Sequence, residues 1–202
     1  MSRAVLLLFL LAFGGSASAQ YFDKAFFIGW VINTPLANQE FAGNTSVRGA
    51  RIGYREIINP KLAVGVDLTM ATYDQYIPRQ TYYSPGSAFT TDFTNIVNTW
   101  GATLSGEYLF FEEKRVMPYA GFGVGVAYNN YKMFYNVYSS ADNVFGVLLR
   151  PRVGTWVRFS ERSAWGLNVS LHMEYSSAKS EEMGYKYFLN PGFEIGLVHL
   201  NW

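Results

Sequence analysis

Apolar and polar residues alternate with a period of two along most of the chain, which is the pattern of β-strands with one buried face. Between residues 165 and 175 every second residue is large and apolar, from Trp165 through Val169 to Tyr175. Spacings of 3.6 residues, which would predict helices, are rare after residue 19. The alternation predicts eight strands, at residues 26–32, 50–54, 62–71, 100–110, 120–129, 145–159, 165–175 and 188–202.

The segments between these strands alternate in length. The long ones are residues 34–46, 74–95, 132–142 and 177–186. The short ones are residues 59–60, 111–115 and 160–162. In outer-membrane barrels the short turns face the periplasm and the longer loops face outward, and an eight-stranded meander closes without free edges. The sequence therefore predicts an all-β chain, an eight-stranded antiparallel up-and-down transmembrane β-barrel.

The composition of the second strand face decides which face meets lipid. A soluble exported barrel of the lipocalin type, with a ligand inside, would place this face in water. The face is instead rich in Gly, Ala, Ser and Asn, as in the run Gly121, Gly123 and Gly125. Glycine weakens a solvated strand, whereas a narrow eight-stranded interior needs small residues beside long ones. We therefore expect the apolar face to meet lipid and the small-residue face to line the lumen.

Aromatic residues near the strand ends support this assignment, because such barrels carry aromatic girdles at both membrane boundaries. The expected girdle consists of Trp30, Tyr54, Trp100, Phe110, Tyr128, Phe145, Phe159, Trp165, Tyr175 and Trp202. The last strand is irregular, since Phe193, Ile195 and Leu197 fall out of phase with Trp202. We place Val198 and Leu200 on the face of Trp202, and predict a bulge or a mixed interior near Gly196.

The first 19 residues have the features of a cleaved signal peptide. Arg3 precedes an apolar run at residues 4–13, and Ala17-Ser18-Ala19 is a small-x-small cleavage site. A short membrane anchor is the alternative, but this run is well below the roughly 20 residues that a spanning helix needs. We expect residues 1–19 to be removed on export and residues 20–202 to form the barrel.

Charge and composition limit the kinds of partner and cofactor that we expect. Removing Arg3 from the 16 basic residues leaves 15, which balance 15 acidic ones, so nothing favours nucleic acid as a partner. Aromatic residues make up 18% of the chain, which argues against disorder. Cysteine is absent, and His172 and His199 are isolated, so we expect no disulfide, metal site or cofactor.

Several charged residues have the phase of the lumen. They are Arg51, Arg55, Asp67, Glu107, Arg150, Arg152, Arg158 and Glu174, with His172 beside them. Folding the predicted hairpins places Arg51 next to Asp67, and Arg150 opposite His172 with Glu174 one diagonal step away. We expect paired interior charges, because buried ions need partners. A small-solute path or a buried proton site is the alternative, although so narrow an interior disfavours an open pore.

These features together resemble a known family. The signal, the eight strands, the segments Pro118-Tyr119-Ala120-Gly121-x-Gly123-x-Gly125 and Leu148-Leu149-Arg150-Pro151-x-Val153-Gly154, and the terminal aromatic are similar to small outer-membrane β-barrels. That family includes the transmembrane domain of outer-membrane protein A, and this chain resembles its single-domain Bacteroidota form over residues 20–202. The resemblance implies a monomer in the outer membrane of a Gram-negative bacterium, with outer-membrane lipid as its partner. It also implies a structural or surface-interaction role through the long loops. The Tyr-rich loop at 74–95 is expected either to bind a surface partner or to cover the barrel mouth.

A second, shorter resemblance concerns the outer-membrane lipid A deacylases. The segments Tyr175-Ser176-Ser177-Ala178 and Asn190-Pro191-Gly192-Phe193-Glu194 are similar to the last part of those enzymes. The resemblance implies Ser176 as nucleophile and Glu194 as carboxylate. Glu174 occupies the position of the family's histidine, and His172 lies two places earlier. Because a serine needs an adjacent base, we expect no catalytic residues, and a hydrolase remains the alternative.

Overall fold

The chain folds into eight strands and one short helix. The strands are β1 (Lys24–Asn33), β2 (Ser46–Asn59), β3 (Leu62–Ser84), β4 (Ser87–Leu109), β5 (Val116–Tyr135), β6 (Tyr138–Arg158), β7 (Trp165–Ser176) and β8 (Phe188–Asn201), and the helix is α2 (Gln39–Ala42). The computed structural model describes residues 23–37, 39–110 and 115–201. The predicted signal peptide, most of the turn at 111–115 and Trp202 lie outside these residues.

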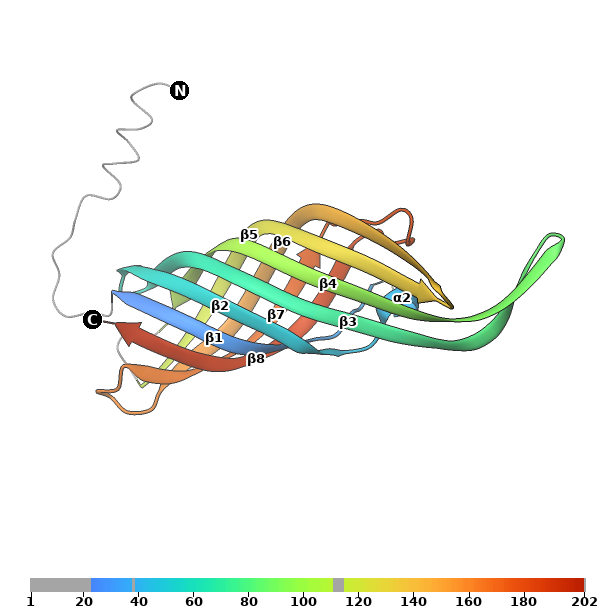
Figure 1. The fold of residues 1–202 in the computed structure, drawn as a ribbon. Helices are drawn as coiled ribbons and strands as arrows, with labels where there is room; N and C mark the ends of the chain where they lie inside the picture. The colour runs from blue at the N-terminus through green and yellow to red at the C-terminus, as the bar shows by residue number, and fades with distance from the viewer. Residues whose placement is uncertain (1–22, 38, 111–114, 202) are drawn as a thin grey trace, which may run out of the picture.

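All eight strands pair antiparallel in sequence order, and β1 also pairs with β8, so the sheet closes into a barrel (Figure 1). The predicted fold class is confirmed. No helix within the described ranges is long and apolar enough to cross a membrane.

The strand registers define the dimensions of the barrel. Starting from Trp30, the pairing partners lead through β2 to β5 as far as Phe145 on β6. In the other direction, through β8 and β7, they lead to Thr155 on β6, ten residues from Phe145. A stagger of ten at about 3.3 Å per residue, over eight spacings of about 4.8 Å, gives a strand tilt of roughly 41° and a backbone radius of roughly 8 Å. Side chains fill an interior of this width.

Two of the four predicted long loops are wrong, because most of their residues are strand. Residues 74–95 continue β3 and β4 to a turn at Pro85 and Gly86, where Gly86 has a φ of 82°. Proline followed by a glycine with positive φ is the arrangement of a type II turn. Residues 132–142 likewise continue β5 and β6 to a turn at Asn136, with a φ of 51°. Figure 1 shows the β3–β4 hairpin projecting far beyond the other strands.

The two strand faces differ as the alternation predicted. Large apolar residues are exposed on the outer wall, for example Ile52, Leu68, Leu104, Val126 and Leu171. The described members of the predicted girdle lie on this wall, half-exposed or exposed; these are Trp30, Tyr54, Trp100, Phe110, Tyr128, Phe145, Phe159, Trp165 and Tyr175.

The placement of Val198 and Leu200 on the outer face is wrong. Both point into the barrel and are fully buried, whereas Phe193 and Ile195 face outward. The pairing of β8 with β1 and with β7 has no register shift. Of the two predicted alternatives, the mixed interior is therefore the one observed. The lumen changes from polar to apolar along β8, and the strand itself stays regular.

Candidate functional site: a packed lumen and a projecting arm

The centre of the lumen holds a cluster of arginines around one aspartate. Arg55 donates to both carboxylate oxygens of Asp67, at 2.9 and 2.8 Å, and Arg152 donates to its Oδ2 at 2.9 Å. Arg51 Nη1 lies 3.4 Å from the same carboxylate, and the Ser105 hydroxyl donates to it at 2.5 Å. Strands β2 and β6 thus contribute charged partners to Asp67 and β4 contributes a hydroxyl, so this carboxylate cross-links the barrel wall through its interior.

Two glutamates complete this central cluster. Glu107 accepts from Arg55 at 2.8 Å and lies 3.0 Å from Arg152. Glu194 lies 2.9 Å from the Nε of Arg51 and accepts from Asn168 at 2.8 Å. Sequence reasoning did not include Glu194 among the lumen charges. The charge imbalance indicated a missing carboxylate, because five inward arginines faced only three inward carboxylates.

The remaining lumen charges lie on β6 and β7. Arg150 pairs with Glu174, and Arg152 rather than Arg150 lies opposite His172 in the register. The predicted opposition of Arg150 and His172 is therefore wrong by one step of two residues. His172 Nε2 instead hydrogen-bonds Asn33 on β1 at 2.9 Å. All the predicted lumen residues are buried, namely Arg51, Arg55, Asp67, Glu107, Arg150, Arg152, Arg158, His172 and Glu174.

Apolar layers lie on both sides of the charged cluster. The layer toward the chain ends consists of Ala25, Phe27, Ala63, Leu109, Met117, Tyr119, Trp156, Val198 and Leu200. The guanidinium carbons of Arg51 and Arg55 lie 5.5 and 5.4 Å from the centre of the Phe27 ring, so this ring separates the layer from the charges through cation–π contacts. The lumen is closed at this end.

The opposite end is closed by an aromatic cap that two loops help to build. Its buried residues are Ala42, Ala71, Tyr73, Val97, Tyr131, Tyr185 and Phe188. The ring of Tyr185, from the loop before β8, stacks on Phe188 with centroids 4.7 Å apart. Hydrogen bonds fasten both loops, because Asn95 donates to the Phe41 carbonyl at 2.9 Å and Tyr131 donates to the Ala178 carbonyl at 2.8 Å. Burial raises the pKa of the Tyr185 hydroxyl above its ordinary value.

The residues of the deacylase resemblance do not meet. Ser176 pairs with Phe188 across β7 and β8, whereas Glu194 pairs with Ser170. Six residues of strand separate these two positions, roughly 20 Å at about 3.3 Å per residue. His172 lies four residues from Ser176, roughly 13 Å along the strand on the same basis. A nucleophile, a base and a carboxylate are therefore not assembled from these residues.

The projecting β3–β4 hairpin and the neighbouring β5–β6 hairpin together carry a series of aromatic rings, which we call the aromatic ladder: Phe89, Tyr82, Phe93, Tyr135 and Tyr138. Tyr82 stacks on Phe89 at 5.3 Å and meets Phe93 edge-on at 5.2 Å. Phe93 contacts Tyr135 on the neighbouring β5–β6 hairpin at 5.9 Å, and Tyr135 stacks on Tyr138 at 5.7 Å. The two hairpins therefore form one continuous extension of the wall, which we call the arm.

Known structures share this architecture. The sequence matches no protein-family model and no curated protein. The crystal structure of Ail, the attachment invasion locus protein of Yersinia pestis, is similar at 11% identity, over 88% of this chain and 95% of that chain, with a TM-score of 0.50. Neisserial surface protein A is similar at 16% identity, over 89% and 96% of the two chains, with a TM-score of 0.48. This chain has the fold of the small eight-stranded outer-membrane β-barrels.

Within that fold, the described part of this barrel offers no metal-binding group of three or more His, Cys, Asp or Glu side chains. The charged cluster of the lumen is held between two apolar layers. The outer wall, the arm and the loops over the cap reach the surroundings, and the outer wall and the arm, which carry the exposed aromatic rings, are the candidates for function.

Proposed function

We propose that this chain is a monomeric outer-membrane barrel of a Gram-negative bacterium, of the single-domain Bacteroidota type. A signal at residues 1–19 directs its export, and lipid surrounds the mature barrel at residues 20–202. The lumen conducts no solute, the barrel catalyses no reaction, and the arm binds an extracellular partner. The arm carries this proposal, because its β3–β4 hairpin projects far beyond the other strands (Figure 1) and carries aromatic rings in contact with one another.

The height of the apolar wall supports the membrane placement. Trp100 and Phe110 both lie on the outer face, ten residues apart along one strand path. At about 3.3 Å per residue and a tilt of roughly 41°, their levels differ by roughly 25 Å, the height of the apolar band in outer-membrane barrels. The two aromatic levels thus match the two boundaries of a bilayer.

The registers add a sharp upper boundary. One outward row, which we call the aromatic row, consists of Trp30, Ala50, Met70, Trp100, Tyr128 and Phe145. The next outward row toward the arm, which we call the polar row, consists of Arg48, Thr72, Asn98, Asn130 and Asn143. A change from aromatic to polar side chains between two neighbouring rows is expected where the hydrocarbon core meets the headgroups.

We therefore expect the protein to fractionate with outer membranes and to need detergent for dispersal. An intact barrel should also migrate differently on a gel before and after boiling, since closed strand pairing keeps it compact. The measurement is sucrose-gradient fractionation followed by gels of boiled and unboiled samples. Recovery as a soluble periplasmic monomer would contradict the membrane placement.

The chemistry of the arm favours a carbohydrate partner. Phe89 and Tyr138 of the aromatic ladder expose 52% and 63% of their surface. Sugar rings stack their C–H faces on such aromatic rings, and the Tyr82 hydroxyl and the Gln80 amide, on the same face of the hairpin, supply hydrogen bonds. Tyrosine provides a large contact area and loses little side-chain entropy on binding. Only Arg79 and Asp92 carry charge between residues 75 and 95, so an uncharged glycan fits best.

Glycan-array binding of the refolded barrel tests this proposal. We expect the double variant Tyr82→Ala, Phe89→Ala to bind neutral oligosaccharides at least about tenfold more weakly, a loss of about 1.4 kcal/mol. Tyr83→Ala is the matched control, because Tyr83 alternates with Tyr82 on the opposite face of the hairpin and is 85% exposed. Absence of wild-type binding, or equal losses in both variants, would contradict a glycan role for the ladder.

A further inference from the structure

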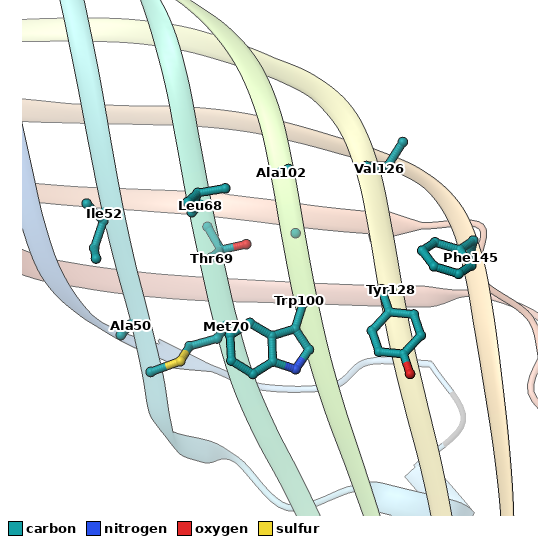
Figure 2. Close-up of a pocket in the computed structure, with 11 residues that line it drawn as sticks. Ala50, Ile52, Leu68, Thr69, Met70, Trp100, Ala102, Val126, Tyr128 and Phe145 are labelled. Atoms are coloured by element: carbon teal, nitrogen blue, oxygen red, sulfur yellow. The ribbon is translucent and has the colours of Figure 1, made fainter.

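The outer wall has an apolar hollow just below the polar row. It spans β2 to β6 and has a volume of about 350 Å³. Figure 2 shows the rings of Trp100, Tyr128 and Phe145 along one side. The small side chains of Ala50 and Ala102 lie among these large neighbours, and the wall is hollow because they leave space unfilled.

The polar row above the hollow supplies hydrogen-bonding groups. Thr72 donates to the side-chain carbonyl of Asn98 at 2.9 Å. Asn130 and the Tyr128 hydroxyl both donate to the side-chain carbonyl of Asn143, the latter at 3.0 Å. Tyr128 therefore belongs to both features, since its ring lines the hollow and its hydroxyl joins the polar row.

Two basic side chains lie near this row, and they differ in whether a carboxylate already pairs with them. Arg48 is paired with Asp74 and is thereby neutralised. Lys132 lies on the outward face of β5, two residues beyond Asn130 and farther from the hollow. Lys132 forms no ion pair with another residue in the described ranges. The site thus offers an apolar hollow, then amides and hydroxyls, and then one available cation.

We propose that this surface is a binding site for a phosphorylated glycolipid of the outer leaflet, of lipid A chemistry. One acyl chain lies in the hollow, the sugar hydroxyls meet the polar row, and a phosphate meets Lys132. The headgroup of phosphatidylethanolamine lacks the hydroxyl groups that a row of Asn and Thr would bind. A second copy of the barrel would present a convex wall and leave the hollow unfilled. The inference rests on the proposed membrane placement and is independent of the arm.

Native mass spectrometry of the detergent-purified barrel with added lipid A tests the acyl-chain part of the site. We expect a retained lipid A adduct, and about tenfold weaker retention for Ala102→Phe, which fills the hollow with an apolar ring. Ala120→Phe is the matched control, since Ala120 lies on the outer wall nearer the periplasmic turns. This control should retain lipid A like the wild type. Equal retention in all three proteins would overturn the proposal.

The headgroup part is tested with Lys132→Gln, and Lys24→Gln at the other end of the barrel is its control. We expect Lys132→Gln alone to weaken retention of diphosphorylated lipid A, by about fivefold, and to leave retention of phosphatidylethanolamine unchanged. If the wild type retains lipid A and phosphatidylethanolamine equally, the glycolipid assignment is contradicted. If the purified protein is a dimer whose interface excludes lipid from the hollow, the proposed lipid site is overturned. A barrel that fractionates with outer membranes but retains no lipid A disproves this inference alone. A soluble periplasmic barrel disproves the membrane placement itself.

Discussion

Replacing Val124 by arginine is expected to destabilise the folded barrel in lipid by roughly 2–4 kcal/mol, the range for a cation at the bilayer midplane. Val124 lies on the outer face of β5 with 48% of its surface exposed. Its neighbours in the register are Leu104 and Leu149, so no polar group on the wall compensates an added charge. Arginine would have to reach the headgroups from near the middle of the apolar band.

The measurement is equilibrium unfolding in urea of the barrel folded into lipid vesicles. Val137→Arg is the control, because Val137 is 83% exposed at the turn of the β5–β6 hairpin, beyond the polar row. The same change there should leave the free energy of unfolding nearly unaltered. If Val124→Arg unfolds at the wild-type urea concentration, the outer wall does not face hydrocarbon.

Replacing Asp67 by asparagine is expected to cost about 3–5 kcal/mol, the range for removing one partner of a buried ion pair. Asp67 is the shared anionic partner of Arg51, Arg55 and Arg152. Asparagine keeps nearly the same shape, so the loss reports charge rather than packing. The three arginines would then remain buried with too few carboxylates, and a desolvated charge without a partner is strongly unfavourable.

A double-mutant cycle with Arg152→Gln distinguishes this cause from a general disturbance of the lumen. Removing Arg152 as well removes part of the excess positive charge, so the double variant should be more stable than the sum of the single effects predicts. Urea unfolding in vesicles again provides the free energies. Glu181→Gln is the control, since its pair with Lys179 is exposed in a loop and should add little. Additive effects of Asp67→Asn and Arg152→Gln would show that the two residues are not energetically coupled.

The sequence alone was sufficient to predict strands and their two faces wherever one strand face must be apolar. Along the wall, lipid requires apolar residues on one face, and the narrow lumen requires small or paired polar residues on the other. Alternation at residues 62–71 and 165–175 therefore revealed strands β3 and β7 and their inner and outer faces. The same reasoning failed for residues 74–95 and 132–142. These hairpins extend past the polar row with no requirement for an alternating face, so their strands leave no period-two signal.

Within the barrel, the alternation determined which side chains enter the lumen, and only the tertiary structure decided which of them meet. The pairing of Arg150 with Glu174 depends on a register that turn composition did not define at 160–162. Glu194 reaches Arg51 from a strand 143 residues away in sequence, because closing the barrel brings β8 beside β1. The hollow over Ala102 likewise arises from five neighbouring strands. Strand existence follows from local periodicity, whereas pairing, closure and surface shape depend on contacts between distant segments that no local pattern records.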